Sequence, residues 1–335
     1  GLAVDGEVED HRFLISGLDF GDAPDSYGTS YDSDGARHAT IRGEGDGLLP
    51  FALGSLVDAE PDGVPSESAD SDDSTGVNDA DGISGLGTPL AAGTSHPIVV
   101  NVTIPPDVFA ASLTGWVDYN IDGDFDDPGE LVVGDFLTPP ISEPLNFNID
   151  VPFAARGGQT HARFRLTSES AIGPDGLAID GEVEDYAITL APCSLDVTTT
   201  TDGGPGSLRD AILCANAMPG PDTITVPAGT YTLDIVGADE DDGETGDLDI
   251  TDDLILVSAT GDPNDVIIDA SAASDRVVHI HGVTVEIRGV TITGGNVDAA
   301  GEMISADNGG GGMLNVDGTL DLIDSIITGN RAGLG

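Results

Sequence analysis

One short segment of the sequence combines residues that bind hard cations with the spacing that a cation site requires. Its oxygen-bearing side chains are Asp118, Asn120, Asp122, Asp124 and Glu130. The first four stand at alternate positions with a glycine among them, which suits a chain that wraps around Ca²⁺. The final acid comes one residue later than in an EF-hand, because position twelve is Gly129, and no helical pattern flanks the segment. We therefore predict a calcium loop between two strands; the alternative is an acidic turn in solvent.

Weaker groups of acids occur elsewhere and could build further calcium sites. Glu182 and Glu184 would point to one face of a strand, where two like charges are unfavourable unless a cation lies between them. In the C-terminal part, residues 239–242 are all acidic and precede two more aspartates. The predicted ligands outside the first loop are Asp22, Asp79, Asp81, Glu182, Asp185, Asp247 and Asp249. Together with the first loop, they predict several Ca²⁺ ions bound to the chain.

Two histidines, His279 and His281, would share one face of a strand and could offer nitrogen ligands to a transition metal. Two ligands alone do not make a site, so we favour surface histidines here. The sequence contains no readable nucleophile–base motif, phosphate-binding glycine loop or zinc motif. These patterns favour a protein that is not an enzyme.

The two cysteines, Cys193 and Cys214, stand on either side of the start of the C-terminal part. In an exported protein they would form a disulfide that closes a loop of about 22 residues and stabilises the fold by roughly 3 kcal/mol. The alternative is a pair of buried, inert thiols.

The elements that must position these residues read as short strands up to residue 190. Apolar and polar residues alternate in runs at 96–104, 113–120, 130–136, 145–151, 160–167 and 183–190. Such lengths, separated by Gly, Pro and Asp, are typical of half-buried strands in an antiparallel β-sandwich. Trp116, the only tryptophan, is expected in its core.

The pattern changes from Ser194 onward. One helix is predicted from Ser207 to Ala217, with Ser207 as its N-cap and apolar residues on one face. Strand-length runs follow, and residues 284–296 repeat at 319–330, so that Ile287 corresponds to Leu322 at an offset of 35. This repetition predicts a parallel β-helix whose inward residues stack, with the helix capping its first coil. The fold class is therefore all-β.

A second repeat bears on domain organisation. Residues 1–10 read GLAVDGEVED and residues 176–185 read GLAIDGEVED. We therefore interpret residues 1–16 as the last strand of an upstream copy, 17–190 as one complete sandwich, and 191–335 as the start of a truncated β-helix. A strand without its own domain would pair with a sheet, so head-to-tail assembly with other copies of the chain is expected as one option.

The charge of the chain restricts its partners. It has 61 acidic residues against 10 basic ones, all arginine, and a formal net charge of −51. Divalent cations or high salt are therefore expected partners, while nucleic acid and anionic membranes are not. A hydrophobic content of 39% in short alternating runs argues against disorder. No stretch is long and apolar enough to insert into a membrane.

Several motifs resemble known families. DFGDAPDSYGT (19–29), WVDYNIDGDF (116–125) and GLAIDGEVEDY (176–186) resemble the GEVED domain of large bacterial surface and secreted proteins. Where that family more often has DDEDG, this chain has NDADG at 78–82. VTTTTDGGPGSLRDAILCANAMPGPDTITV (197–226) with TGDLDITDDL (245–254) is similar to the start of pectin-lyase-like right-handed β-helices of bacterial and archaeal adhesins. These resemblances imply a structural or adhesive role.

We therefore expect a calcium-stabilised extracellular segment of a large repetitive surface protein, such as a stalk, filament or surface layer. Surface glycans or proteins are its expected outside partners. One alternative is a carbohydrate-active β-helix, a lyase or glycosidase, with Arg276 and Arg288 beside acids as its only active-site candidates. Another is a carbohydrate- or protein-binding module.

Overall fold

The computed structural model describes residues 17–40, 51–57, 59–71, 80–106, 108–138, 144–237, 241–273, 275–297 and 309–332. Within-chain contacts divide the protein into two compact units between Thr189 and Leu190, and the short segments 89–96 and 150–158 group with the second unit. The predicted first strand, residues 1–16, and the predicted ligand Asp79 lie outside the described residues. In the described part, no helix is long and apolar enough to cross a membrane.

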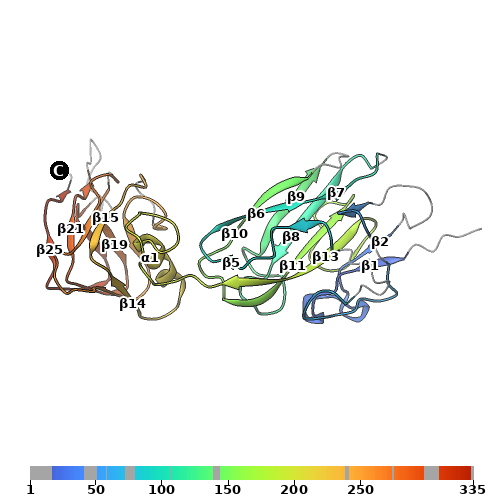
Figure 1. The fold of residues 1–335 in the computed structure, drawn as a ribbon, viewed down its shortest axis with the longest axis horizontal. Helices are drawn as coiled ribbons and strands as arrows, with labels where there is room; N and C mark the ends of the chain where they lie inside the picture. The colour runs from blue at the N-terminus through green and yellow to red at the C-terminus, as the bar shows by residue number, and fades with distance from the viewer. Residues whose placement is uncertain are drawn as a thin grey trace, which may run out of the picture. The chain divides into compact units, whose positions relative to one another are not determined.

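The largest sheet of the sandwich has five strands (Figure 1). Their order is β5 (Leu90–Ala91), β13 (Glu182–Ala191), β11 (Gly158–Thr167), β8 (Ala111–Val117) and β9 (Leu131–Thr138). β11 and β8 pair antiparallel, with Arg163 opposite Trp116. β8 also pairs antiparallel with β9, and its register shifts between Leu113 and Trp116. β8 lies between β11 and β9 and is buried along its whole length.

Shorter sheets complete the first part of the chain. One has the order β10 (Leu145–Asp150), β6 (Ser95–Val100) and β4 (Ile83–Ser84), and another β1 (Leu18–Phe20), β2 (Arg37–Ala39) and β12 (Leu177–Ala178). β3 (Ala52–Leu53) pairs with β7 (Val102–Thr103), and the 3₁₀ turns are η1 (Asp25–Tyr27) and η2 (Tyr31–Ser33). Trp116 is buried, as predicted. Two short pairs, β12 with β2 and β13 with β5, are parallel and depart from a purely antiparallel sandwich.

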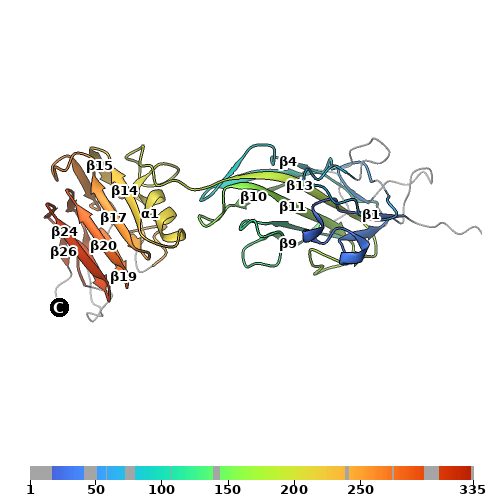
Figure 2. The same cartoon turned by 90° about the horizontal axis from the view of Figure 1, so that it is seen from below.

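The C-terminal part consists of stacked parallel sheets (Figure 2). The first wall contains β14 (Asp222–Val226), β17 (Leu254–Ser258), β20 (Thr284–Arg288) and β24 (Thr319–Ile323). The second contains β15 (Gly229–Thr232), β18 (Val266–Asp269), β21 (Thr291–Thr293) and β25 (Ile326–Ile327). The third contains β16 (Leu248–Ile250), β19 (Val278–His281) and β23 (Met313–Val316), and β22 (Asn296–Val297) pairs with β26 (Arg331–Ala332). The predicted all-β class is therefore confirmed, and this part is consistent with a parallel β-helix.

The register explains why the second repeat occurs in the sequence. Ile287 lies opposite Leu322 and Ile292 opposite Ile327, at the predicted offset of 35. On the first wall, Leu256 lies between Ile224 and Ile287, and all three are buried. Equivalent apolar side chains therefore stack from coil to coil, which removes their surface from water.

Helix α1 (Leu208–Ala217) forms where it was predicted. The Ser207 Oγ accepts a hydrogen bond from the Asp210 backbone N–H at 3.0 Å, which satisfies one of the free donors of the first turn. Met218 is extended because the next residue is a proline, and the helix ends there. The helix contacts β14 and β16. Its buried face includes Cys214, which is joined to Cys193 by a disulfide bond with 5.7 Å between the Cα atoms.

We predict that this disulfide stabilises the second unit mainly by restricting its unfolded state. Replacing both cysteines by serine, Cys193→Ser with Cys214→Ser, should lower the free energy of unfolding by about 3 kcal/mol for a loop of this length. Denaturant unfolding followed by circular dichroism measures the loss. An unchanged unfolding midpoint, or full alkylation of the unreduced and unfolded wild-type protein, would contradict the prediction.

Candidate metal sites

The loop between β8 and β9 is organised from both ends by carboxylates. The Asp118 side chain is buried, and its Oδ1 accepts the Ile121 N–H at 2.6 Å while its Oδ2 accepts the Gly123 N–H at 3.1 Å. Asp118 Oδ2 also accepts the Tyr27 hydroxyl at 2.6 Å. At the other end, the Glu130 carboxylate accepts the N–H groups of Tyr119 and Asp127, each at 3.2 Å. These two acids therefore fix the loop backbone.

The loop needs its glycines for this path. Gly123 has φ +96° and Gly129 has φ +97°, a backbone region that side chains with a Cβ rarely adopt. Ile121, two residues before Gly123, also has a left-handed φ of +57°. Of the alternate residues of the motif, Asp118 turns inward to the loop backbone, while Asp122 is exposed.

Three carboxylates gather on the exposed side of the loop. Asp122, Asp124 and Asp127 each offer an oxygen atom, and these atoms lie within 4.8 Å of one another. The Asn120 Nδ2 donates to Asp122 Oδ2 at 3.0 Å and also to Asp127 Oδ2, so its N–H groups lie between two carboxylates. Of the predicted ligands, the structure thus brings Asp122 and Asp124 together beside Asn120.

The sequence analysis missed Asp127, which does not follow the alternate spacing. The sequence feature that could have indicated Asp127 is its position immediately before Pro128-Gly129, where the chain turns back toward β9. Burial raises the pKa of Glu130 to about 7, against two backbone hydrogen bonds that lower it, and the nearby charges of Asp118 and Asp127 raise it further. This site is therefore crowded with negative charge.

Asp185, another predicted ligand, forms a buried ion pair with Arg163. The Arg163 Nε lies 2.7 Å from Asp185 Oδ1, and its Nη2 donates to Oδ2 at 2.8 Å. Burial would raise the pKa of Asp185, but the Arg163 charge and its hydrogen bonds outweigh burial and hold the pKa below its usual value. Asp185 Oδ2 also accepts the Ala23 N–H at 2.9 Å.

Most of the other predicted ligands in this part accept hydrogen bonds from backbone N–H groups. Asp22 Oδ2 accepts the Ser71 N–H at 2.8 Å, and Glu182 Oε2 accepts the Leu53 N–H. Asp81 accepts both the backbone N–H and the hydroxyl of Ser55, at 2.9 and 2.8 Å. Within the described residues, two groups of possible metal ligands lie close together, and none of these acids belongs to either group.

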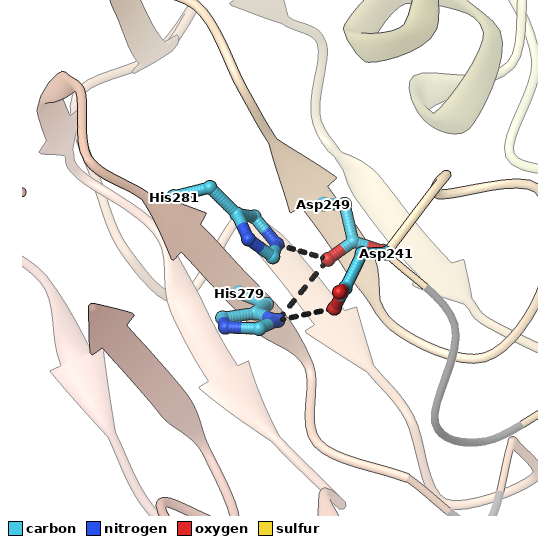
Figure 3. Close-up of side chains that lie close together, drawn as sticks. All are labelled: Asp241, Asp249, His279 and His281. Carbon is cyan, nitrogen blue, oxygen red and sulfur yellow. Dashed lines mark hydrogen bonds and ion pairs between the residues drawn. The ribbon is translucent and has the colours of Figure 1, made fainter. Parts of the chain in front are cut away.

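The second such group contains Asp241, Asp249, His279 and His281 (Figure 3). His279 is buried and His281 half-buried, so the expectation of surface histidines is wrong for His279. The loop before β16 packs over this wall, because a Cβ added at Gly243 would lie 3.4 Å from the Asp249 Cβ. The residues next to the histidines in the sequence give no indication that this loop packs against them.

The predicted ligand Asp247 lies beside Arg276, whose Nε is 3.6 Å from Asp247 Oδ2. Burial raises the pKa of Asp247 to about 8, and the nearby charges of Asp249 and Asp275 raise it further. Arg288 pairs at 2.6 Å with Glu286 on its own strand and is half-exposed.

Glu184 gives a pH prediction for the sandwich. Its Oε1 accepts the N–H groups of Asp81 and Gly82, both at 2.8 Å, and burial raises its pKa to about 8 despite these bonds. Between about pH 4.5 and 8 the unfolded chain therefore ionises Glu184 while the folded protein keeps its proton. Because the folded state binds more protons than the unfolded state, the free energy of unfolding falls as the pH rises through this range.

Relative to Glu184→Gln, the wild-type protein should lose about 4 kcal/mol of unfolding free energy between pH 4.5 and 8. Urea unfolding of both proteins across this range, in the presence of a chelator, measures the difference. Parallel pH dependences of the two proteins would contradict the prediction.

The comparison with known families agrees with this architecture over part of the chain. Residues 112–189 match the family model of the GEVED domain. No curated protein and no solved structure matches the chain. The matched span runs from β8 to β13 and includes the whole Asp118–Glu130 loop. Residues 112–189 are therefore identified as part of a GEVED domain, as their sequence motifs predicted.

Proposed function

We propose that this chain is a calcium-stabilised structural or adhesive segment of a large extracellular surface protein. The GEVED match suggests a structural or adhesive module of surface proteins. The observation that carries the calcium part is the group of Asp122, Asp124 and Asp127 oxygens within 4.8 Å of one another on a tightly hydrogen-bonded loop.

Calcium fits this loop for chemical reasons. Ca²⁺ binds six to eight oxygen ligands at about 2.3–2.6 Å and tolerates irregular geometry, so water can complete a partly exposed site. The Asn120 amide lies between two of the carboxylates and can turn its oxygen toward an ion. Because Asp118 and Glu130 already fix the backbone, the ligands are held near one another before the ion arrives.

The net charge supports a wider role for cations. With a formal charge of −51, the folded chain repels itself, and bound divalent ions would reduce this repulsion. The affinity expected for such an exposed site is that of extracellular modules, with a Kd of about 10⁻⁴–10⁻³ M. The site would therefore fill in calcium-rich surroundings outside a cell.

Secretion to the cell surface is part of the same proposal. A disulfide between Cys193 and Cys214 is typical of proteins that fold in an oxidising compartment. The proposed role is mechanical rather than catalytic, and the proposed partners are other copies of this chain and surface glycans or proteins.

We predict that Ca²⁺ stabilises the sandwich through the Asp122–Asp127 group. At 100 times its Kd, calcium should raise the free energy of unfolding by about 2.7 kcal/mol for one occupied site. Asp124→Asn should remove most of this gain. Asp126→Asn is the matched control, because Asp126 is exposed in the same loop, has the same charge and lies outside the group.

Calorimetric melting with calcium, with chelator and with sodium at equal ionic strength measures these effects. Equal calcium shifts in both variants would place the stabilising ion elsewhere. No shift on chelation at moderate salt would overturn the calcium proposal.

A further inference from the structure

A group of mixed nitrogen and oxygen ligands lies on the third wall of the coil stack, and the calcium proposal does not involve it. β16 and β19 are parallel neighbours, with Asp249 directly opposite His279. His281 follows two residues later and therefore shares the face of His279. Leu248, Ile250 and Ile280 belong to the buried apolar core, so the histidines and Asp249 point to the opposite side of the wall.

Side chains from three places meet there (Figure 3). Asp249 Oδ1 lies 2.7 Å from His281 Nε2 and 3.3 Å from His279 Nδ1. The Asp241 Oδ1 comes from the loop before β16 and lies 3.6 Å from His279 Nδ1. All four ligand atoms are within 4.8 Å of one another. We propose that Asp241, Asp249, His279 and His281 bind one transition-metal ion of the Zn²⁺ type.

Three of the six separations among the four ligand atoms bracket the value expected around such an ion, and all six are within 4.8 Å. A tetrahedral zinc site with bonds of about 2.0–2.1 Å has ligand atoms roughly 3.3 Å apart. The three measured separations lie on both sides of this value. Small side-chain rotations would therefore bring the four atoms to a common centre. Calcium fits less well, because it prefers six to eight oxygens and two of the atoms here are imidazole nitrogens.

The contacts of His279 Nδ1 suit a metal ligand at this atom. The Arg276 Nη1 lies 3.3 Å from His279 Nδ1, and a guanidinium can only donate, so the neutral tautomer that accepts this bond presents a lone pair at Nδ1. The same nitrogen faces carboxylate oxygens of Asp249 and Asp241 at 3.3 and 3.6 Å. A metal ion at the centre would be coordinated by this nitrogen and both carboxylates together.

The positive charge of Arg276 is not confined to this group. It also lies 3.6 Å from Asp247 and 3.9 Å from Asp275, so it faces two other buried acids. The guanidinium is therefore shared with acids outside the group of four ligands. A divalent ion would add positive charge where the histidine nitrogens and the two carboxylates meet.

The two imidazoles also favour a metal over simple protonation. Their ring centroids lie 3.7 Å apart, so two imidazolium ions here would repel each other. Two neutral rings that coordinate one ion remove this repulsion. The ion would also connect an exposed loop to the wall, because the Asp241 carboxylate is 74% exposed while that of Asp249 is fully buried. Its role would be to fasten the loop before β16 to two stacked coils.

Zinc binding to the whole chain in millimolar calcium tests the proposal. The excess calcium fills the oxygen-only sites, so isothermal titration should show one tight zinc equivalent that depends on nitrogen ligands. Asp241→Asn and His281→Asn should each weaken the zinc Kd at least about tenfold. Glu244→Gln is the matched control, because Glu244 lies exposed in the same loop and loses the same charge. It should leave the zinc Kd unchanged.

Co²⁺ provides a second readout that does not depend on stability. A tetrahedral site with two nitrogen ligands should give intense visible ligand-field absorption, which disappears in His281→Asn. Failure of zinc to bind under calcium would show that Arg276 alone balances the cluster. Equal zinc affinities for wild type, Asp241→Asn and His281→Asn would place the ion elsewhere. Either result overturns the proposal and leaves the calcium loop of the sandwich unaffected.

Discussion

Carboxylates outnumber guanidinium groups about six to one in this chain, and the fold depends on how its few arginines are used. Arg163 is fully buried, binds Asp185 through two nitrogens and donates to the carbonyls of Tyr27 and Gly28. Arg209 does the same in the second unit, with Asp202 as its acid and four backbone carbonyls from residues 243–247 as further acceptors. Each of these two arginines therefore fixes the backbone of nearby loops and does not act as an exposed surface charge. Removing either one would leave buried acceptors without donors, which costs more than an exposed ion pair contributes.

Backbone N–H groups donate hydrogen bonds to many of the remaining acidic side chains. Asp118 and Glu130 hold the β8–β9 loop from opposite ends, and Glu184 holds the turn at residues 81 and 82. An acid used in this way stabilises a loop without any cation. The proposed calcium ion would instead lie where acids gather on the exposed side of a loop, as at Asp122, Asp124 and Asp127. The two uses of carboxylates explain why a dense acidic sequence can fold into ordered turns.

Much of the fold was predictable because strand alternation and coil repetition are local patterns. The strand predicted at 160–167 forms most of β11, and the repeat offset of 35 corresponds to the pairing of Ile287 with Leu322. The ligand roles were less predictable. Spacing alone could not distinguish Asp118, which turns inward to the backbone, from Asp127, which joins the exposed group. Nor could it reveal that the loop before β16 brings Asp241 next to the buried His279, because that contact depends on how the coils stack.

The segment around β16 concentrates the cross-links of the second unit. Arg209 of α1 donates to the Asp247 carbonyl at 2.7 Å, and Asn216 of the same helix donates to the Asp249 carbonyl at 2.8 Å. The helix itself is tied to residue 193 by the disulfide. On its other side, β16 pairs with β19, and the Asp249 carboxylate reaches both histidines. In stacked-coil proteins each coil is stabilised mainly by its neighbours, so the first coils lack support on one side. Covalent, ionic and hydrogen-bonded links that converge on one strand compensate for that missing neighbour, and a metal at the histidines would extend the same connection from α1 to the next coil.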